Sequence, residues 1–565
     1  MNAKLKTPLK KQKAPLLLTI GAAATLIGGG GIAYWFFTRQ EQLSVMPAGS
    51  SVIPQDALMV VSVSTDPGQW QQLREFGTVR SQAEFDQNLA RLRDRFLTSR
   101  GLEYQRDVQP WVGKEVTMAF LPPQSGITVP PSNQPATPPT PQPIVMVLPM
   151  ANPLKAKEVL EQSPATKSGS WTQRDYKGVQ IRENQGSPDQ TASVAVIDAK
   201  EVVVANNPRA IERAIDTYKG SASLMQTPGY GEALTQINSD QSMARFYVNI
   251  PAAVNTTVAN SDRQLPPQSI AQIQQNQGLA ATATIANEGI QFKTVSWLKP
   301  DSKRKFDTSN NAKMMPSRLP NETLMMASGG NLKRFWQDYT QGVAANPIQF
   351  VNPEALKQGI KSTVGLDFDQ DLLNWMQGEY SLALLPAPQG APAGLPASLV
   401  FMVQTNDRRA AETALKKLDD VMASKYSFKV EDSKIEGQSV TNWTLPAANV
   451  NITRGWLDGD VAFISLGAPV TQTFLPKPAN ALAENDLFRK STVSELGAKN
   501  GHFFVDVDRV LALQNFPLLQ LPAANRTMIE AIKSIGVTAA ITSDRTSRYD
   551  VFVTLQKGNK PGALP

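Results

Sequence analysis

Apolar and polar positions follow two different periods along this chain, and stretches of the two kinds alternate. Short apolar runs bounded by turn residues, such as residues 57–64 and 323–328, predict strands. Longer stretches carry apolar residues three or four positions apart, which predicts amphipathic helices. The two clearest helical patterns are formed by Phe85, Leu89, Leu92 and Phe96, and by Ala411, Leu415, Leu418 and Met422. This mixture predicts an α+β fold of mainly antiparallel sheets with packed helices.

A pattern of 22 residues occurs twice in the chain. Gly101–Pro122, "GLEYQRDVQPWVGKEVTMAFLP", matches Gly365–Pro386, "GLDFDQDLLNWMQGEYSLALLP", without a gap. Further matches follow in the same order: Ile53–Ser62 with Leu319–Ser328, the segment from Ala244 with that from Gly501, and the segment from Gly278 with that from Gly536. We therefore predict two tandem homologous lobes, residues 53–300 and 319–558, with a polar linker at 301–318 and a tail at 559–565.

Helix starts are marked by one local signal, an Asp or Asn followed by Pro. The Asp or Asn side chain accepts a free backbone N–H of the first turn, and proline has no N–H to leave unpaired there. Four such pairs predict helix N-termini: Asp66-Pro67, Asn152-Pro153, Asn207-Pro208 and Asn352-Pro353.

The N-terminal segment predicts a membrane anchor. Five lysines precede a run without charged residues from Ala14 to Thr38. Residues 16–38 are long enough to cross a hydrocarbon core of about 30 Å as a helix. We expect a basic cytoplasmic tail at 1–15, a transmembrane helix at 16–38, a linker at 39–52 and a periplasmic or lumenal body, in a single-pass protein of the plasma or thylakoid membrane. The alternative is a cleaved signal peptide, which is usually shorter.

Composition narrows the possible partners. The net charge is +7, but the five N-terminal lysines account for most of it, and the remaining 51 basic residues nearly balance the 49 acidic ones. A nucleic-acid-binding surface needs clustered basic residues, so we expect no nucleic-acid partner. The chain has no cysteine, which excludes disulfides and thiolate metal sites.

Few residues of the sequence suggest catalysis or metal binding. His502 is the only histidine, and Arg245 is its counterpart in the first lobe. Asp506 and Asp508 lie on one face of a predicted strand, where they could bind a cation or act as acid and base. The first lobe has Asn249 and Pro251 at the matching positions. A solvated or structural role is the simpler interpretation of each.

The repeated pattern supplies the other candidates. Asp367, Asp369 and Asp371 resemble the start of a calcium loop, but the central glycine and final glutamate are lacking, and the first lobe has Glu103, Gln105 and Asp107 instead. Glu115 and Glu379 are repeated, as are Trp111 and Trp375, which we expect in the core. We assign no catalytic, cofactor-binding or metal-binding residue.

Two proline-rich loops, residues 122–143 and 386–397, connect predicted neighbouring strands. The first has nine prolines in 22 residues. Such composition favours an exposed polyproline II segment that could bind a partner, or a tolerated loop insertion.

The stretches "IPQDALMVVSVSTDPGQW" from Ile53 and "RDVQPWVGKEVTMAFLP" from Arg106, with the anchor and the paired lobes, resemble a cyanobacterial membrane-anchored family, domain of unknown function 3352. The resemblance implies an envelope or thylakoid-membrane location. It supplies no catalytic residue.

These observations leave three hypotheses for function. The favoured one is a non-enzymatic scaffold that binds an envelope or thylakoid-membrane partner. The second is a carrier or sensor that holds a small or apolar ligand within the lobes. The third is a carboxylate-dependent hydrolase that uses Asp506 and Asp508.

Overall fold

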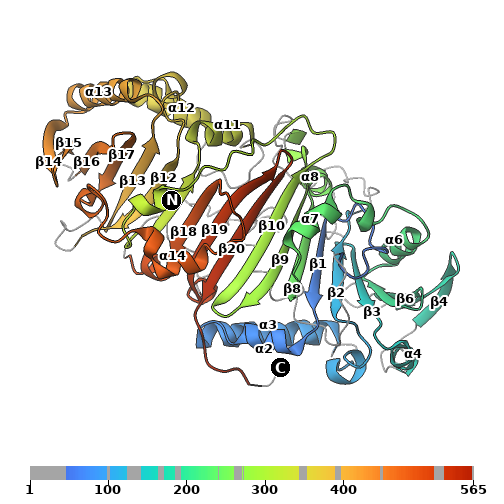
Figure 1. The fold of residues 1–565 in the computed structure, drawn as a ribbon. Coiled ribbons are helices and arrows are strands. Elements are labelled where there is room, and N and C mark those ends of the chain that lie inside the picture. Colours follow the sequence, from blue (N-terminus) through green and yellow to red (C-terminus); the bar gives the residue numbers. More distant parts are fainter. Residues whose placement is uncertain are drawn as a thin grey trace, which may run out of the picture.

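Within the residues that it describes, the computed structural model contains one continuous antiparallel sheet of twenty strands (Figure 1). It describes residues 46–97, 102–123, 142–162, 171–184, 192–239, 241–259, 270–271, 273–342, 353–388, 396–445, 450–513 and 527–562. We call residues 46–298 the first half and residues 299–562 the second half.

Each half contributes ten strands. Those of the first half are β1 (Met59–Ser64), β2 (Glu115–Phe120), β3 (Ile144–Pro149), β4 (Trp171–Tyr176), β5 (Val179–Asn184), β6 (Ala192–Ile197), β7 (Glu201–Ala205), β8 (Ser242–Asn249), β9 (Asn276–Ala286) and β10 (Gly289–Leu298). Those of the second half are β11 (Met325–Gly329), β12 (Tyr380–Pro386), β13 (Ala397–Gln404), β14 (Lys429–Ile435), β15 (Gln438–Leu445), β16 (Val450–Leu457), β17 (Val461–Gly467), β18 (Gly501–Asp506), β19 (Ile532–Ser543) and β20 (Thr546–Leu555).

The strand order of one half recurs in the other. The first half runs β4-β5-β6-β7-β3-β2-β1-β8-β9-β10 from the outer edge to the centre. The second half runs β14-β15-β16-β17-β13-β12-β11-β18-β19-β20. At the centre, β10 pairs with β20 over nine register positions from Gly289 to Trp297.

Helices cover both faces of the sheet. The first half has α2 (Pro67–Arg74), α3 (Val79–Phe96), the π-helix η3 (Tyr104–Val108), α4 (Pro153–Gln162), α6 (Pro208–Tyr218), the 3₁₀ turn η4 (Leu224–Gln226), α7 (Tyr230–Ile237) and α8 (Ile250–Ala259). The second half has α10 (Met315–Arg318), α11 (Leu332–Gly342), α12 (Pro353–Val364), the π-helix η6 (Phe368–Leu373), α13 (Arg408–Ser424), the 3₁₀ turns η8 (Thr471–Thr473) and η9 (Leu482–Glu484), α14 (Asp486–Ser491) and α15 (Val507–Leu511).

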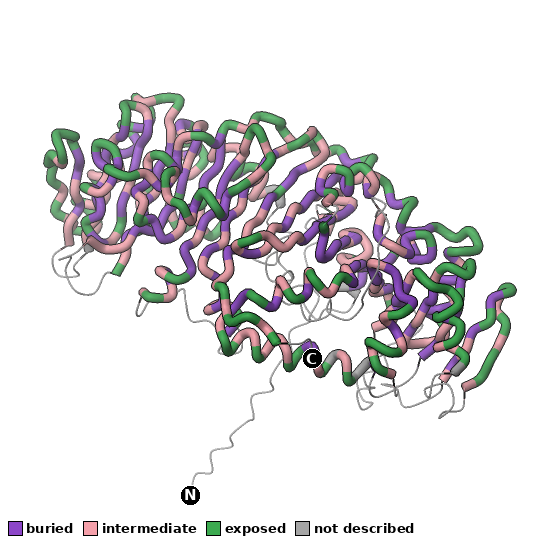
Figure 2. The backbone as a smooth tube through the Cα atoms, turned by 60° about the horizontal axis from the view of Figure 1, so that its bottom comes forward, coloured by how far each residue is buried: buried purple, intermediate pink, exposed green. Residues whose placement is uncertain are grey.

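Alternation along the strands divides the core into two layers. On the face that carries α7 and α14, α7 residues such as Leu234 pack on sheet residues such as Val60 and Tyr247. On the opposite face, Trp70 of α2 and Leu89 of α3 pack on Phe246 and Phe292. We call these the α7 face and the α3 face. Buried residues accordingly follow the strands, while exposed ones line the outer helices and loops (Figure 2).

The prediction of two lobes with separate sheets is wrong. Each half alone would leave the backbone N–H and C=O groups of β10 or β20 unpaired at a long edge, which favours pairing with another strand. The two edges satisfy each other, so the halves form one sheet.

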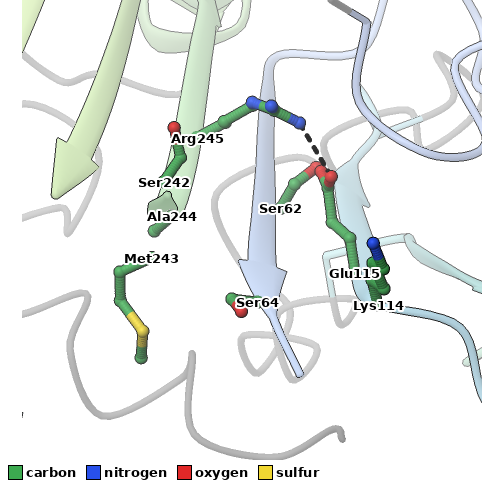
Figure 3. Close-up of a pocket in the computed structure, with 8 residues that line it drawn as sticks. All are labelled: Ser62, Ser64, Lys114, Glu115, Ser242, Met243, Ala244 and Arg245. Atoms are coloured by element: carbon green, nitrogen blue, oxygen red, sulfur yellow. Dashed lines mark hydrogen bonds and ion pairs between the residues drawn. The ribbon is translucent and has the colours of Figure 1, made fainter. Parts of the chain in front are cut away.

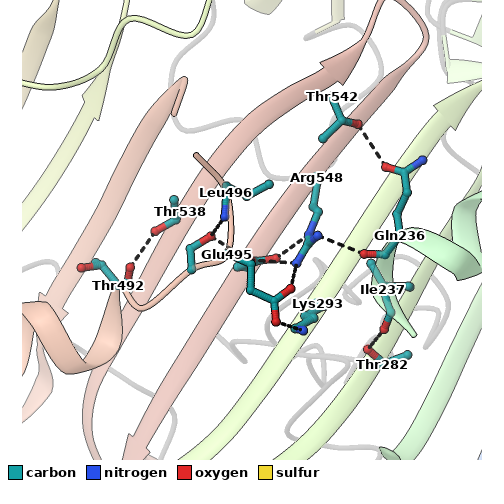
Figure 4. A network of polar contacts seen from close by, with 12 residues as sticks. Gln236, Ile237, Thr282, Lys293, Thr492, Glu495, Leu496, Thr538, Thr542 and Arg548 are labelled. Carbon is teal, nitrogen blue, oxygen red and sulfur yellow. Dashed lines mark hydrogen bonds and ion pairs between the residues drawn. The ribbon is translucent and has the colours of Figure 1, made fainter. Parts of the chain in front are cut away.

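Side chains strengthen this junction on the α7 face (Figure 4). Arg548 of β20 donates to the backbone oxygen of Gln236 in α7 at 3.0 Å, and Lys293 of β10 pairs with Glu495 at 2.6 Å. Arg548 also pairs with Glu495 at 3.2 Å. The contacts of Arg548 with Gln236 and of Lys293 with Glu495 join the two halves, while that of Arg548 with Glu495 lies within the second half.

The predicted single-pass membrane anchor is also corrected. Within the ranges that the structure describes, no helix is both long and apolar enough to cross a membrane. Residues 16–38, on which the predicted anchor and membrane location depended, lie outside those ranges. We therefore withdraw both predictions.

Local predictions agree better with the structure. The two helical patterns are confirmed as α3 and α13. Three of the four helix-start signals are confirmed, because Asp66, Asn152 and Asn207 each accept a backbone N–H at the start of α2, α4 and α6. The helix α12 begins at Pro353, and Asn352 lies outside the described residues.

Candidate functional site

A buried ion pair lies on the α7 face of the first half, where β1 has β2 on one side and β8 on the other. Ser62 of β1 pairs in register with Thr117 of β2 and with Arg245 of β8. Arg245 Nη1 donates to Glu115 Oε2 at 2.8 Å, and both side chains are almost fully buried (Figure 3). The Ser62 and Thr117 hydroxyls share a hydrogen bond of 2.7 Å.

A small cavity adjoins this pair. Its volume of about 10 Å³ is close to that of one water-sized probe. Arg245 Nε and Nη2 have no hydrogen-bond partner among the described residues. Burial raises the pKa of Glu115, while the charge of Arg245 opposes that rise. The cavity is lined by Ser62, Ser64, Lys114, Glu115, Ser242, Met243, Ala244 and Arg245.

The same place in the second half has different chemistry. Glu379 accepts backbone N–H groups from Lys313, Met314 and Met315, the segment that leads into α10, at 2.8–2.9 Å. His502 is buried beside Ser328 in register, and its Nδ1 has no partner among the residues described. Burial, helped by the charge of Lys499, lowers the pKa of His502 to about 4.

The sequence pairs Glu115 with Glu379 and Arg245 with His502, and the structure places each pair at equivalent positions. It adds the contact between Arg245 and Glu115, which are 130 residues apart. The sequence feature that points to this contact is the alternation of side chains along the strands. It places Glu115, Thr117 and Arg245 on one face of the sheet, but only once the strand order is known.

Asp506 and Asp508 do not form a shared site. Asp506 is buried, and its side chain accepts the backbone N–H of Arg509, so it caps α15. Burial raises the pKa of Asp506. Asp508 lies in α15 and is exposed, where it accepts a hydrogen bond from Gln556 at 3.2 Å. In the part of the chain that the structure describes, no cluster of three or more His, Cys, Asp or Glu could hold a metal ion.

The carboxylates of the repeated pattern accept hydrogen bonds from backbone N–H groups of the same segment. Asp367 caps η6 by accepting the N–H groups of Asp369 and Gln370. Asp371 in turn accepts the N–H of Asp367 at 2.9 Å, which lowers the pKa of Asp371, and Lys417 contributes to that effect. In the first half, Asp107 accepts the N–H of Glu103 in the same way at 2.7 Å.

The repeated tryptophans belong to the same unit. Trp111 and Trp375 are buried, which confirms the prediction that they lie in the core. Each donates its indole N–H to the carbonyl of the repeated aspartate, Asp107 or Asp371, at 2.7 and 3.0 Å. The 22-residue repeat is therefore a π-helical turn, a buried tryptophan and a strand.

A groove of about 430 Å³ lies over this unit in the second half. It runs between η6 and the start of α13, and the ion pair of Asp371 and Lys417, at 3.1 Å, crosses it. Its other lining residues are Gln370, Asn374, Trp375, Asn406, Asp407, Arg409, Ala410, Thr413 and Ala414.

The second half also exposes an apolar surface on the α3 face. One side chain from each of six neighbouring strands stands in register there. None of the six is buried, and Leu382 is 39% exposed, although Phe401 packs in part against Trp375 and Ala411 of α13. Leu399 and Leu466, which face each other across β13 and β17, widen this surface and are 39% and 47% exposed. We call the six residues the apolar row: Val537, Phe503, Ala327, Leu382, Phe401 and Ile464.

Most of each proline-rich loop lies outside the described residues, which omit 124–141 and 389–395. Their role as binding segments stays a prediction.

Over residues 19–555 the chain matches the family model described as "Protein of unknown function (DUF3352)". The chain belongs to this family. The match confirms the resemblance found in the sequence, while the cyanobacterial origin stays a prediction. The family description carries no activity, so function has to be argued from the structure.

No curated protein matches the chain. Among solved structures, crystal forms III and IV of TP0453 are similar at 11% identity, with TM-scores of 0.24 and 0.25. They cover 46% of this chain and 81% and 82% of their own. A similarity this low supports no inference about function.

Proposed function

We propose that the protein is a non-enzymatic binding protein that holds a protein partner against the apolar row of its second half. The observation that carries the proposal is the exposure of Leu382, Leu399 and Leu466 on adjoining strands. Contiguous apolar surface that stays in water typically marks an interaction site.

The carboxylates that the sequence offers as catalytic candidates already accept hydrogen bonds within the protein, which supports a binding role over catalysis. Glu379, Asp506 and Asp367 are each occupied with backbone N–H groups of their own chain. Groups committed in this way stabilise the fold and are poorly placed to exchange protons with a substrate.

The test is native mass spectrometry of the full-length protein purified from the cells that make it. We expect a stoichiometric protein partner with the wild type and its loss with Leu382→Asp. The matched control is Leu154→Asp, since Leu154 is 82% exposed on α4 in the first half. Thermal unfolding checks that both variants fold. Equal partner recovery with the wild type and Leu382→Asp would refute the proposal.

A second candidate is a carrier of a small polar ligand, which the groove between η6 and α13 favours by its volume of about 430 Å³. The same spectra test it. A small bound mass that disappears in Lys417→Met, with the protein partner absent, would support the carrier function instead.

A further inference from the structure

The apolar row has a direct counterpart in the first half. The equivalent residues stand in register across β9, β8, β1, β2, β3 and β7. The equivalence follows from the shared strand order, in which β8 and β18 flank the first strands β1 and β11. The counterpart row consists of Ala281, Phe246, Val61, Met118, Met146 and Val204.

The two rows differ in burial. Four members of the counterpart row are buried, namely Ala281, Phe246, Val61 and Met146. In the apolar row the equivalents Val537, Phe503 and Phe401 are partly exposed, and Ala327 is exposed. The side chains are apolar in both rows, so the difference lies in what covers them.

In the first half the helical hairpin α2–α3 covers the inner part of the counterpart row, while Met146 packs in a separate cluster with Trp111 and with Ala156 of α4. Trp70 and Leu89 are fully buried and pack in one cluster with Val61, Phe246 and Ala281. Val505, Ile535 and Val551 of the second half pack against the same cluster. Val537 stands next to Val551 in register, so the apolar row continues this interface beyond the helices.

The corresponding helices of the second half lie elsewhere. α11 and α12 stand between the first strand and the π-helix, as α2 and α3 do. Trp336 of α11 packs on Phe368 of η6, with ring centroids 4.6 Å apart, and α12 contacts α13 and η6. Pro353 is the only residue of α12 that is buried. In Figure 1, α11, α12 and α13 lie together at the upper left, away from the centre of the sheet.

We infer that the apolar row binds an amphipathic helix of the partner protein, which at the inner end of the row takes the place that α2 and α3 take on the first half. The inference rests on the proposed function and adds the form of the bound segment. Six strands spaced about 4.8 Å apart make the row about 24 Å long. A helix of about 16 residues covers that length, and α3 has 18 residues.

The test is site-specific photo-crosslinking in the cells that make the full-length protein. p-Benzoylphenylalanine replaces Ala327 in one variant and Ile464 in another, and mass spectrometry locates the crosslinked residues on the partner. The two positions are three strand spacings apart, about 14 Å. On a helix lying along the row their crosslinks fall about ten residues apart, whereas on an extended segment they fall about four apart. Val61, which is buried, and Leu154 are the control positions.

Crosslinks about ten residues apart, on a segment with apolar residues every three or four positions, are the expected result. Crosslinks about four residues apart would show that the bound segment is extended. That result would refute the helix and would still agree with the proposed function. Crosslinks to a second copy of this chain would overturn the inference in favour of self-association. An absence of crosslinks specific to positions 327 and 464 would overturn both.

Discussion

Lys293 lies directly opposite Asp550 at the centre of the sheet, in the register of β10 with β20. Each is the fifth residue of its strand, so the axis that relates the two halves passes between them. Identical charged residues at this position would face each other with like charge, which destabilises a sheet. Here the duplicated strands carry opposite charges, so this repulsion is avoided.

Replacing Asp550 with Ala should weaken this junction strongly. The Asp550 side chain is fully buried and accepts hydrogen bonds from Arg548 at 2.9 Å and from Ser494 at 2.7 Å. Its removal leaves the buried Arg548 without its main partner, which typically costs about 3–5 kcal/mol. Urea denaturation should report that loss in the free energy of unfolding.

The control is Glu495→Gln, because Glu495 is 65% exposed. It should change the free energy of unfolding by no more than about 1 kcal/mol. Equal effects of the two substitutions would contradict the importance of the buried carboxylate at the axis.

Removing Arg245 should destabilise the protein more than removing the whole ion pair. Arg245→Met leaves the buried Glu115 carboxylate without its partner, an expected cost of about 3–5 kcal/mol. Adding Glu115→Gln to that variant removes the unpaired charge and should recover part of the stability. Chemical denaturation of the wild type, both single variants and the double variant gives the coupling energy. A double variant as unstable as the sum of the single ones would show that the pair does not interact.

Stability should fall as pH drops from 6.5 to 4, in part through His502. The folded protein holds the pKa of His502 at about 4, below its ordinary value of 6.5. In that range the unfolded chain binds a proton that the folded protein excludes, so acid favours unfolding. Well above pH 6.5 the imidazole is neutral in both states and the effect vanishes.

A pKa shift of this size lowers the free energy of unfolding by about 3 kcal/mol between pH 6.5 and pH 4. His502→Gln removes the titrating group, so the free energy of unfolding of the variant should depend less on pH between 4 and 6.5 than that of the wild type. Identical slopes for the two proteins would contradict the burial of a neutral imidazole.

Local structure was predictable from sequence because its causes are local. The spacing of Phe85 and Leu89 is enough to specify α3, and the Asp66-Pro67 pair marks the start of α2. The pairing of β10 with β20 was not predictable, because alternation tells which side chains point inward and does not tell which edges meet. The same limit hid the contact of Arg245 with Glu115, which depends on β1 lying between β2 and β8.

The apolar row was hidden for a further reason. Leu382 occupies the same place in the repeated pattern as Met118, and both are apolar strand residues. Their exposure is decided by distant elements, since Met118 packs against the cluster that includes Trp111 and Ala156 of α4, while Leu382 is 39% exposed. The local sequence pattern does not show which elements will cover these strand residues.

Thiol reactivity of single-cysteine variants tests this central asymmetry most directly, because the natural chain has no cysteine. Ala327→Cys and Val61→Cys occupy equivalent positions on β11 and β1. With the purified protein alone, the thiol at position 327 should react with Ellman's reagent much faster than the thiol at position 61, which α2 and α3 cover. In the complex with the partner, the thiol at position 327 should become protected as well. Equal, slow reaction of both thiols in the free protein would show that the apolar row is already covered, and would contradict the account.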